Sequence, residues 1–367
     1  MKKILHLIML CVPLLLITAC DVHEFPGGNE VRVPFLLHLD FNTELPLYKE
    51  VVYTRNGSSD TKHAYERHDI RYTIKVYRSE TLTRSNREAF QTYVFTKSDI
   101  EDLNFTAPLE LPEGEFQFQV WADYVDAGST ADKYYDTRDF SEIILAKKYN
   151  HPGSNDFRDA FRGYATATVM NPEYYAGEMA TTIDNRATAE MRRPMGKFKF
   201  VSNDVDMFIT RVEEMIKEKG KNINFVPNLE MDSRAAFEKM LENINLAGFK
   251  VVFRYNLFMP CSFNMFTDKP ADSWTGMSFE SQMYSEEYNE MTMGYDYIFV
   301  NGSETTLSIS VDVYDKDGEL LSSTNPINVP IVRSKLTLVT GDFLTSKASE
   351  GVSISPDFDG EYNIVIK

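Results

Sequence analysis

Apolar residues that recur at every second position are the feature of this sequence that most restricts its fold. The pattern appears at 35–41, 70–76, 116–124, 249–257, 307–313 and 362–366. Because successive side chains of a strand point to opposite faces, the alternation predicts antiparallel strands with one buried face. Turn sequences such as Pro112-Glu113-Gly114 and Asp357-Phe358-Asp359-Gly360 separate these segments. Many strands at such spacings favour β-sandwiches, so we expect a mostly β protein.

Two segments follow helical spacing instead, and they predict helices near 204–219 and 233–246. In the first, Val205, Phe208, Ile209 and Val212 share one face, and Gly220 is suited to end the helix. The second has Asp232 or Ser233 as its cap. Its apolar face consists of Phe237, Met240, Leu241 and Ile244. We expect both helices to cover a sheet with these faces.

The length of 367 residues makes two hydrophobic cores more plausible than one. The first run of strands ends near Met191-Arg192-Arg193-Pro194, just before the predicted helices. We therefore expect an N-terminal sandwich domain at 31–190 and a C-terminal sandwich domain at 191–367 that contains both helices. The net charge of −17 argues against a nucleic-acid partner, because phosphate binding needs a basic face.

The first residues have the organisation of a bacterial lipoprotein signal peptide. Lys2 and Lys3 precede an apolar run from Ile4 to Ile17, which is too short to span a bilayer comfortably. The sequence Ile17-Thr18-Ala19-Cys20 then matches a lipobox, with Ile at the position where Leu is usual. We expect cleavage of residues 1–19, acylation of Cys20 and a short tether over 20–30. The alternative is an ordinary secretory signal that ends near a cysteine.

Cysteine usage agrees with an exported protein that has no internal disulfide. Processing would remove Cys11 and acylate Cys20, which leaves Cys261 alone. Beside Pro260 and Phe263, we expect Cys261 to be a small buried hydrophobic residue rather than a nucleophile. Since the mature chain is strongly acidic, the acyl chains rather than a basic surface would hold it on the membrane.

The sequence contains none of the catalytic or cofactor-binding motifs sought, so we expect no enzyme activity, no cofactor and no metal. There is no H-E-x-x-H, no G-x-S-x-G and no phosphate-binding glycine loop. His63 and His68 are five residues apart, which is poor spacing for two ligands on one helix face. Asp315, Asp317 and Gly318 match only part of a calcium-binding loop, and a hairpin turn explains them better.

Three further stretches resemble the fimbrillin-like surface lipoproteins of Bacteroidales, which are subunits and accessory proteins of type V pili. They are 120–126 (VWADYVD) after 111–114 (LPEG), then 158–163 (RDAFRG), and finally 329–345, from Val-Pro-Ile to Gly-Asp-Phe-Leu-Thr. The resemblance covers nearly the whole mature chain. It implies two transthyretin-like β-sandwich domains, an anchor in outer-membrane lipid through acylated Cys20, other fimbrial subunits as partners, and a role in adhesion.

The resemblance also implies an assembly mechanism. In such stalk subunits an Arg-specific protease removes the first strand, and a strand from a neighbouring subunit fills the groove. Here the first strand would be Val31–Phe41, and Arg55 in the following loop is the candidate processing site. Arg55 as an ordinary solvated arginine remains the alternative. The candidate donor strand carries Tyr362, Ile364 and Ile366 at alternate positions.

An outer-membrane glycan-binding lipoprotein is the second functional hypothesis. Trp121, Trp274 and the many tyrosines could form a stacking platform for sugars. Trp121 and Gln119 lie on the strand face opposite Phe118, so we expect Gln119 to tolerate substitution. For Trp121 two interpretations stay open: an outward sugar platform, or packing beneath a loop.

Overall fold

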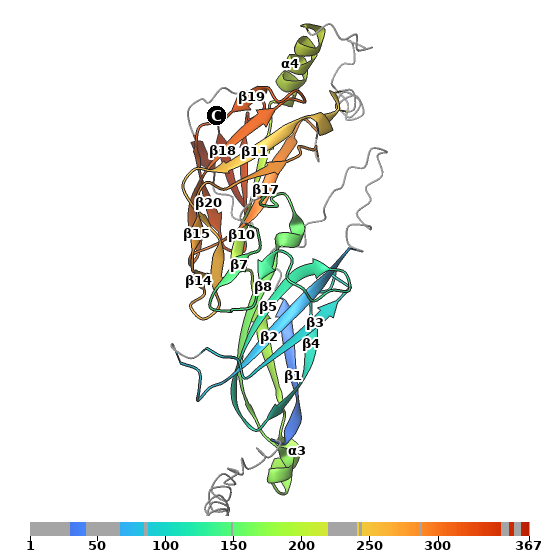
Figure 1. Cartoon of the computed structure of the whole chain (residues 1–367), viewed down its shortest axis with the longest axis vertical. Coiled ribbons are helices and arrows are strands. Elements are labelled where there is room, and N and C mark those ends of the chain that lie inside the picture. The colour runs from blue at the N-terminus through green and yellow to red at the C-terminus, as the bar shows by residue number, and fades with distance from the viewer. Residues whose placement is uncertain are drawn as a thin grey trace, which may run out of the picture.

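The computed structural model describes residues 30–41, 67–83, 87–147, 150–218, 241, 244–285, 288–345, 352–355 and 361–366. Over these residues the protein is mostly β, as the alternation predicts. Figure 1 shows two groups of strands stacked end to end along the long axis of the molecule. The first group is built mainly from residues before 192, and the second mainly from residues after 194.

Two sheets make up the first group. One is fully antiparallel, in the order β3-β2-β5-β8. Its strands are β2 (His68–Arg78), β3 (Gln91–Lys97), β5 (Gly114–Asp126) and β8 (Ala160–Val169). The other sheet has the order β4-β1-β9. It contains β1 (Arg32–Phe41), β4 (Phe105–Pro112) and β9 (Arg186–Met191).

The first core lies between these two sheets and receives side chains from both. Phe35 of β1 stacks on Phe118 of β5, with 5.0 Å between ring centroids. Phe118 is fully buried, as the alternation predicts. Since a core between two sheets needs one apolar face from each, the period-two pattern of β1 and β5 is explained by this contact.

The expectation that β5 has only one buried face is wrong, whereas Trp121 agrees with the packed one of its two interpretations. Gln119 is 4% exposed and Trp121 is fully buried, so β5 is covered on both faces beyond Gln117. The physical reason is that a second set of residues packs there: the Trp121 ring lies against Tyr135, Phe263 and Phe299. Trp121 therefore belongs to the second core, although its strand belongs to the first group of sheets.

The second group also contains two larger sheets. One has the order β17-β10-β21-β23-β22, and the other has the order β16-β11-β18-β19, with β20 also paired to β18. The first of them comprises β10 (Met195–Ser202), β17 (Met291–Phe299), β21 (Leu336–Gly341), β22 (Val352–Ser355) and β23 (Glu361–Ile366). The second comprises β11 (Lys250–Tyr255), β16 (Ser278–Ser281), β18 (Glu304–Tyr314), β19 (Leu320–Ser323) and β20 (Ile327–Val332).

The expectation of purely antiparallel sheets is also wrong, because three strand pairs are parallel. They are β1 with β9, β10 with β21, and β21 with β23. Alternation reports which face of a strand is buried and carries no information about the direction of its neighbour. In each parallel pair the two strands are separated in the sequence by other elements, because parallel strands need a crossover connection.

Short strands connect the two groups. A small sheet has the order β14-β13-β7-β6, in which Ser262 and Phe263 of β13 pair with Ile144 and Ile143 of β7. Its strands are β6 (Tyr135–Asp136), β7 (Ile143–Leu145), β13 (Ser262–Asn264) and β14 (Lys269–Pro270). A further pair consists of β12 (Met259–Pro260) and β15 (Ser273–Trp274). Residues 135–145 thus pack into the second core, although they precede residue 191.

The main described helix is α4 (Val205–Glu218), where the apolar spacing predicts one. Its Val205, Phe208, Ile209 and Val212 side chains are buried in the second core. Residues 233–240, 242 and 243 of the other predicted helix lie outside the described residues, whereas Leu241 and Ile244 are helical and buried. The sequence did not predict α3 (Glu178–Thr182) or the short 3-10 turns at Asp156–Arg158, Pro172–Tyr174 and Leu246–Gly248. Within the described ranges, no helix is long and apolar enough to cross a membrane.

Candidate functional site: the groove occupied by β1

Strand β1 is the element most directly related to the predicted assembly mechanism. Its residues alternate strictly between exposed and buried along the whole strand. The buried set is Val33, Phe35, Leu37, Leu39 and Phe41. Full burial of one large apolar side chain is worth about 1.5–3 kcal/mol, so the strand contributes on the order of 10 kcal/mol. That is comparable with the whole stability of a typical protein.

Backbone pairing holds β1 on both sides. It is antiparallel to β4 from Arg32 to Leu39, and parallel to β9 from Leu36 to Phe41. Pro34 has no backbone N–H to donate. Because the pairing of β1 with β9 begins only at Leu36, this absence costs no hydrogen bond on the β9 side of the strand. Removal of β1 would leave β4 and β9 without their shared partner and would open a groove between them.

Aromatic rings form the floor of this groove. In addition to the Phe35–Phe118 stack, the Phe41 ring meets Phe161 edge-on at 5.1 Å and Tyr72 at 6.2 Å. Without β1, these rings would face water, and backbone groups of two strands would lose their partners. The groove is therefore suited to receive another apolar strand with the same alternation.

The other predicted site residues do not lie together around this groove. Cys20 and Arg55 are outside the described residues. Arg32 is the first residue of β1, and its Nη1 donates to the Gln91 side chain and, at 3.2 Å, to the Glu110 carbonyl. The candidate donor residues Tyr362, Ile364 and Ile366 belong to β23, in the other group of sheets.

Strand β23 already has partners in its own chain. It pairs in parallel with β21, where Ile364 is opposite Val339, and antiparallel with β22, where Ile364 is opposite Ile354. Donation of β23 to a neighbour would thus require its release from β21. Since β22 is the edge strand, β22 and β23 could leave together and expose only the β21 edge.

A buried polar network that the sequence analysis did not find lies where the two groups meet. Asp296 of β17 accepts hydrogen bonds from His151 at 2.6 Å and Tyr255 at 2.5 Å, and it is ion-paired with Arg158. Burial opposes ionisation of Asp296, but Arg158 and His151 lower its pKa to about 2. Burial, followed by the charge of Arg158, lowers the pKa of His151 below its usual value. Asp296 is thus a buried carboxylate that pairs with the Arg158 guanidinium and is hydrogen-bonded to His151 and Tyr255.

Two further buried ion pairs reinforce this junction. Arg193 holds Asp159 through its Nε at 2.9 Å and 2.8 Å, and Lys197 Nζ lies 2.7 Å from Asp156. Asp156, Arg158 and Asp159 lie on one 3-10 turn and its cap. Arg158 and Asp159, in the stretch that carries part of the family resemblance, thus pair with Asp296 of β17 and with Arg193, just before β10.

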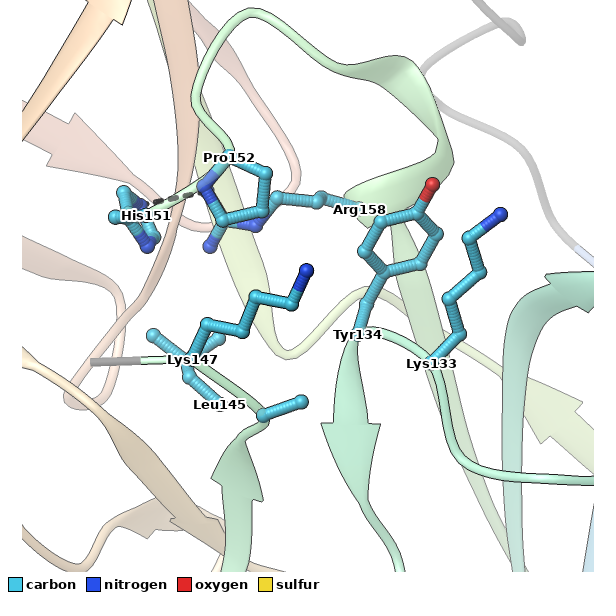
Figure 2. Close-up of a pocket in the computed structure, with 8 residues that line it drawn as sticks. Lys133, Tyr134, Leu145, Lys147, His151, Pro152 and Arg158 are labelled. Atoms are coloured by element: carbon cyan, nitrogen blue, oxygen red, sulfur yellow. Dashed lines mark hydrogen bonds between the residues drawn. The ribbon is translucent and has the colours of Figure 1, made fainter. Parts of the chain in front are cut away.

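A small cavity borders this network and is too small for a sugar. Figure 2 shows Lys133, Tyr134, Lys147 and His151 around it, and its volume is about 60 Å³. A water molecule needs roughly 10–15 Å³ by such a measure, so the cavity has room for a few waters. The buried Nδ1 of His151 lacks a hydrogen-bond partner among the described residues.

The tryptophan platform of the glycan-binding hypothesis does not form. Trp121 is fully buried, and Trp274 is half-buried against the second core. Because Trp121 is packed between the two groups of sheets, its ring is not available for stacking on a ligand. The hypothesis loses the residue on which it chiefly depended.

The remaining sequence candidates have structural roles. Cys261 is buried in the second core, as expected. Asp315 accepts hydrogen bonds from the backbone N–H groups of Asp317 and Glu319 in the turn between β18 and β19, which is the predicted hairpin. His68 stacks on Phe157, whereas His63 lies outside the described residues. The described ranges contain no cluster of residues that could hold a metal ion.

These features define a mostly β protein with two cores joined by buried ion pairs. The chain belongs to the family of unknown function DUF6562, whose model matches residues 31–367. A search of curated proteins finds no match.

Several solved structures are similar to the chain at low identity. One is the fimbrial anchor protein Mfa2 from Porphyromonas gingivalis, with 10% identity, a TM-score of 0.35 and coverage of 80% of this chain and 82% of that one. Another is a fimbrial assembly protein from Parabacteroides distasonis, with 10% identity, a TM-score of 0.34 and coverage of 88% and 94%. These scores are too low to carry an argument about function.

Proposed function

We propose that this chain is a structural or accessory subunit of a cell-surface fimbria that assembles by β-strand addition and mediates adhesion. In this proposal the chain has two β-sandwich domains, at 31–190 and 191–367, and acylated Cys20 anchors it in the outer membrane. The lipobox and the three stretches quoted above support this assignment. Fimbrial descriptions recur among the similar structures, but the proposal depends on the sequence and on β1.

The observation that carries the proposal is the placement of β1. An N-terminal strand with five buried apolar side chains lies between β4 and β9, and residues 42–66, including Arg55, connect it to β2. Cleavage after Arg55 would convert β1 from a part of the chain into a separate peptide. Dissociation of that peptide then exposes a groove whose shape and pairing suit another alternating strand.

In the assembled fibre, β23 of a second subunit fills this groove. Tyr362, Ile364 and Ile366 alternate in the same way as the buried residues of β1. A contact of this head-to-tail kind does not close on itself, so it produces a filament. Each subunit would lose its own β21–β23 pairing and gain the pairing with β4 and β9 of its neighbour.

The test is treatment of the purified protein with an Arg-specific protease, followed by gel electrophoresis without boiling. We expect a ladder of polymers from the wild-type protein and monomers from Arg55→Ala. Arg138→Ala is the matched control, because Arg138 is strongly exposed and its substitution should leave the ladder intact. Treated wild-type protein that loses residues up to 55 and stays monomeric would contradict the proposal.

A substitution in β23 tests the donor strand separately. Protease-treated Ile364→Asp should fail to polymerise, because a charge entering an apolar groove must be desolvated without a partner. Asn363→Asp places the same carboxylate one position away, on the other strand face, and should polymerise. Circular dichroism checks that both variants remain folded. Normal polymer growth of folded Ile364→Asp would exclude β23 as the donor.

A further inference from the structure

A second cavity, at the junction of the two groups of sheets, is lined by four arginines. Its volume is about 440 Å³, and it receives Arg162, Arg192 and Arg193 from one side and Arg333 and Asp268 from the other. Four arginines around one cavity are unexpected in a protein of net charge −17. The volume falls within the range of roughly 300–1,000 Å³ that is usual for small-molecule sites.

The acidic partners inside the cavity do not balance these arginines. Arg333 binds the Asp268 carboxylate through two nitrogens, at 2.6 Å and 3.0 Å, and Arg162 binds the same carboxylate at 2.6 Å. Two positive charges therefore share one negative charge. Arg193 is paired with buried Asp159, and Arg192 is paired with Glu190 at the surface.

The surroundings of Arg162 show the same excess of positive charge. Arg162 and Arg192 exchange backbone hydrogen bonds of 2.9 Å in an antiparallel bridge, which places two like charges directly opposite each other. The buried Nε–H of Arg162 finds no acceptor among the described residues. Burial lowers the pKa of Arg162, and Arg333 and Arg192 add to this effect, while Asp268 opposes it. A bound anion would offset the repulsion between these like charges.

We propose that this arginine cavity binds an oxyanion, carboxylate or sulfate, carried by a small acidic sugar. Guanidinium groups bind planar carboxylates and sulfates through paired hydrogen bonds. The hydroxyls of Ser303 and Ser334, which also line the cavity, can bond to sugar hydroxyls. An acidic polypeptide fits less well, because the net charge of the protein repels a chain that carries many negative charges. Neither β1 nor β23 lines the cavity, so this site goes beyond the strand exchange proposed above.

Isothermal titration calorimetry of the whole purified protein tests the assignment with defined probes. Glucuronate represents the carboxylate, glucose 6-sulfate represents the sulfate, and glucose is the neutral control. We expect one of the charged sugars to bind at one site per chain and glucose not to bind at the same concentration. The affinity should fall as salt is added, because the attraction is electrostatic.

Arg192→Gln is the most informative variant, because Arg192 is exposed and its loss should leave the fold intact. A hydrogen bond to a charged group is worth about 1.5–3 kcal/mol, so the charged sugar should bind about ten- to a hundredfold more weakly. Arg186→Gln is the matched control: Arg186 is equally exposed, and it too pairs with an acid two residues earlier, Asp184. Arg186→Gln should bind the charged sugar with the same affinity as the wild type.

Asp268→Asn removes the internal anion that competes for Arg162 and Arg333. In a protein that still melts cooperatively, it should tighten binding of the charged sugar by about tenfold.

Three results would overturn the proposal. The first is that neither charged sugar binds the wild type or Asp268→Asn. The second is that Arg192→Gln binds as tightly as the wild type. The third is that inorganic sulfate, acetate or an acidic peptide binds as tightly as the charged sugars, which would exclude a sugar as the preferred ligand.

Discussion

Replacement of Phe118 by Ala tests the first core directly. Phe118 is fully buried on β5 and stacks on Phe35 of β1 across the space between the two sheets. Loss of its transfer free energy costs about 1.5–3 kcal/mol. The cavity that remains and the lost ring pairing bring the expected decrease in the free energy of unfolding to about 3–5 kcal/mol.

Urea denaturation followed by circular dichroism measures this decrease. Tyr164→Ala is the matched control, because this aromatic residue lies on neighbouring β8 but is 49% exposed, and it should change the stability by about 0.5 kcal/mol or less. A loss below about 1 kcal/mol for Phe118→Ala, with an unchanged slope against urea, would refute the packing argument. Fluorescence of the two tryptophans, Trp121 and Trp274, which both pack in the second core, can report in the same titration whether that core unfolds together with the first.

Two further predictions concern the anchor and the junction. Cys20→Ala should prevent acylation and move the protein into the soluble fraction; a variant that still partitions with membranes in detergent extraction would rule out the lipobox. Asp296→Asn should lower the free energy of unfolding at pH 7 by about 3–5 kcal/mol, because it leaves Arg158 buried without its counter-charge. The native pKa of Asp296, about 2, is below its ordinary value of 3.8, so its stabilisation is present above pH 4 and is lost as the pH falls from 4 to 2. Thermal melts should show a larger loss of stability between pH 4 and 2 for the wild type than for Asp296→Asn; equal acid sensitivity would contradict the assignment.

The buried faces of individual strands could be predicted from the sequence because they depend on local periodicity. The alternation of Phe35, Leu37 and Leu39 identifies the buried side of β1, and the structure buries these residues. The spacing of Val205, Phe208 and Ile209 likewise identifies the inner face of α4. These patterns need no knowledge of which element lies opposite, since any apolar partner satisfies them.

Only the tertiary structure decided which partner each face meets and in which direction each strand runs. Trp121 and Phe118 are three residues apart on β5, yet they enter different cores, because residues 135–145 and β13 return to cover the second face. The parallel pairing of β1 with β9 joins Leu36 to Arg186 across 150 residues of sequence. In the same way, the arginine cavity combines Arg162, Arg192 and Arg333, which no sequence motif links. Local periodicity identifies the apolar face that must be buried, whereas the cover on the opposite face and the contacts between distant segments arise from the packing of the whole chain.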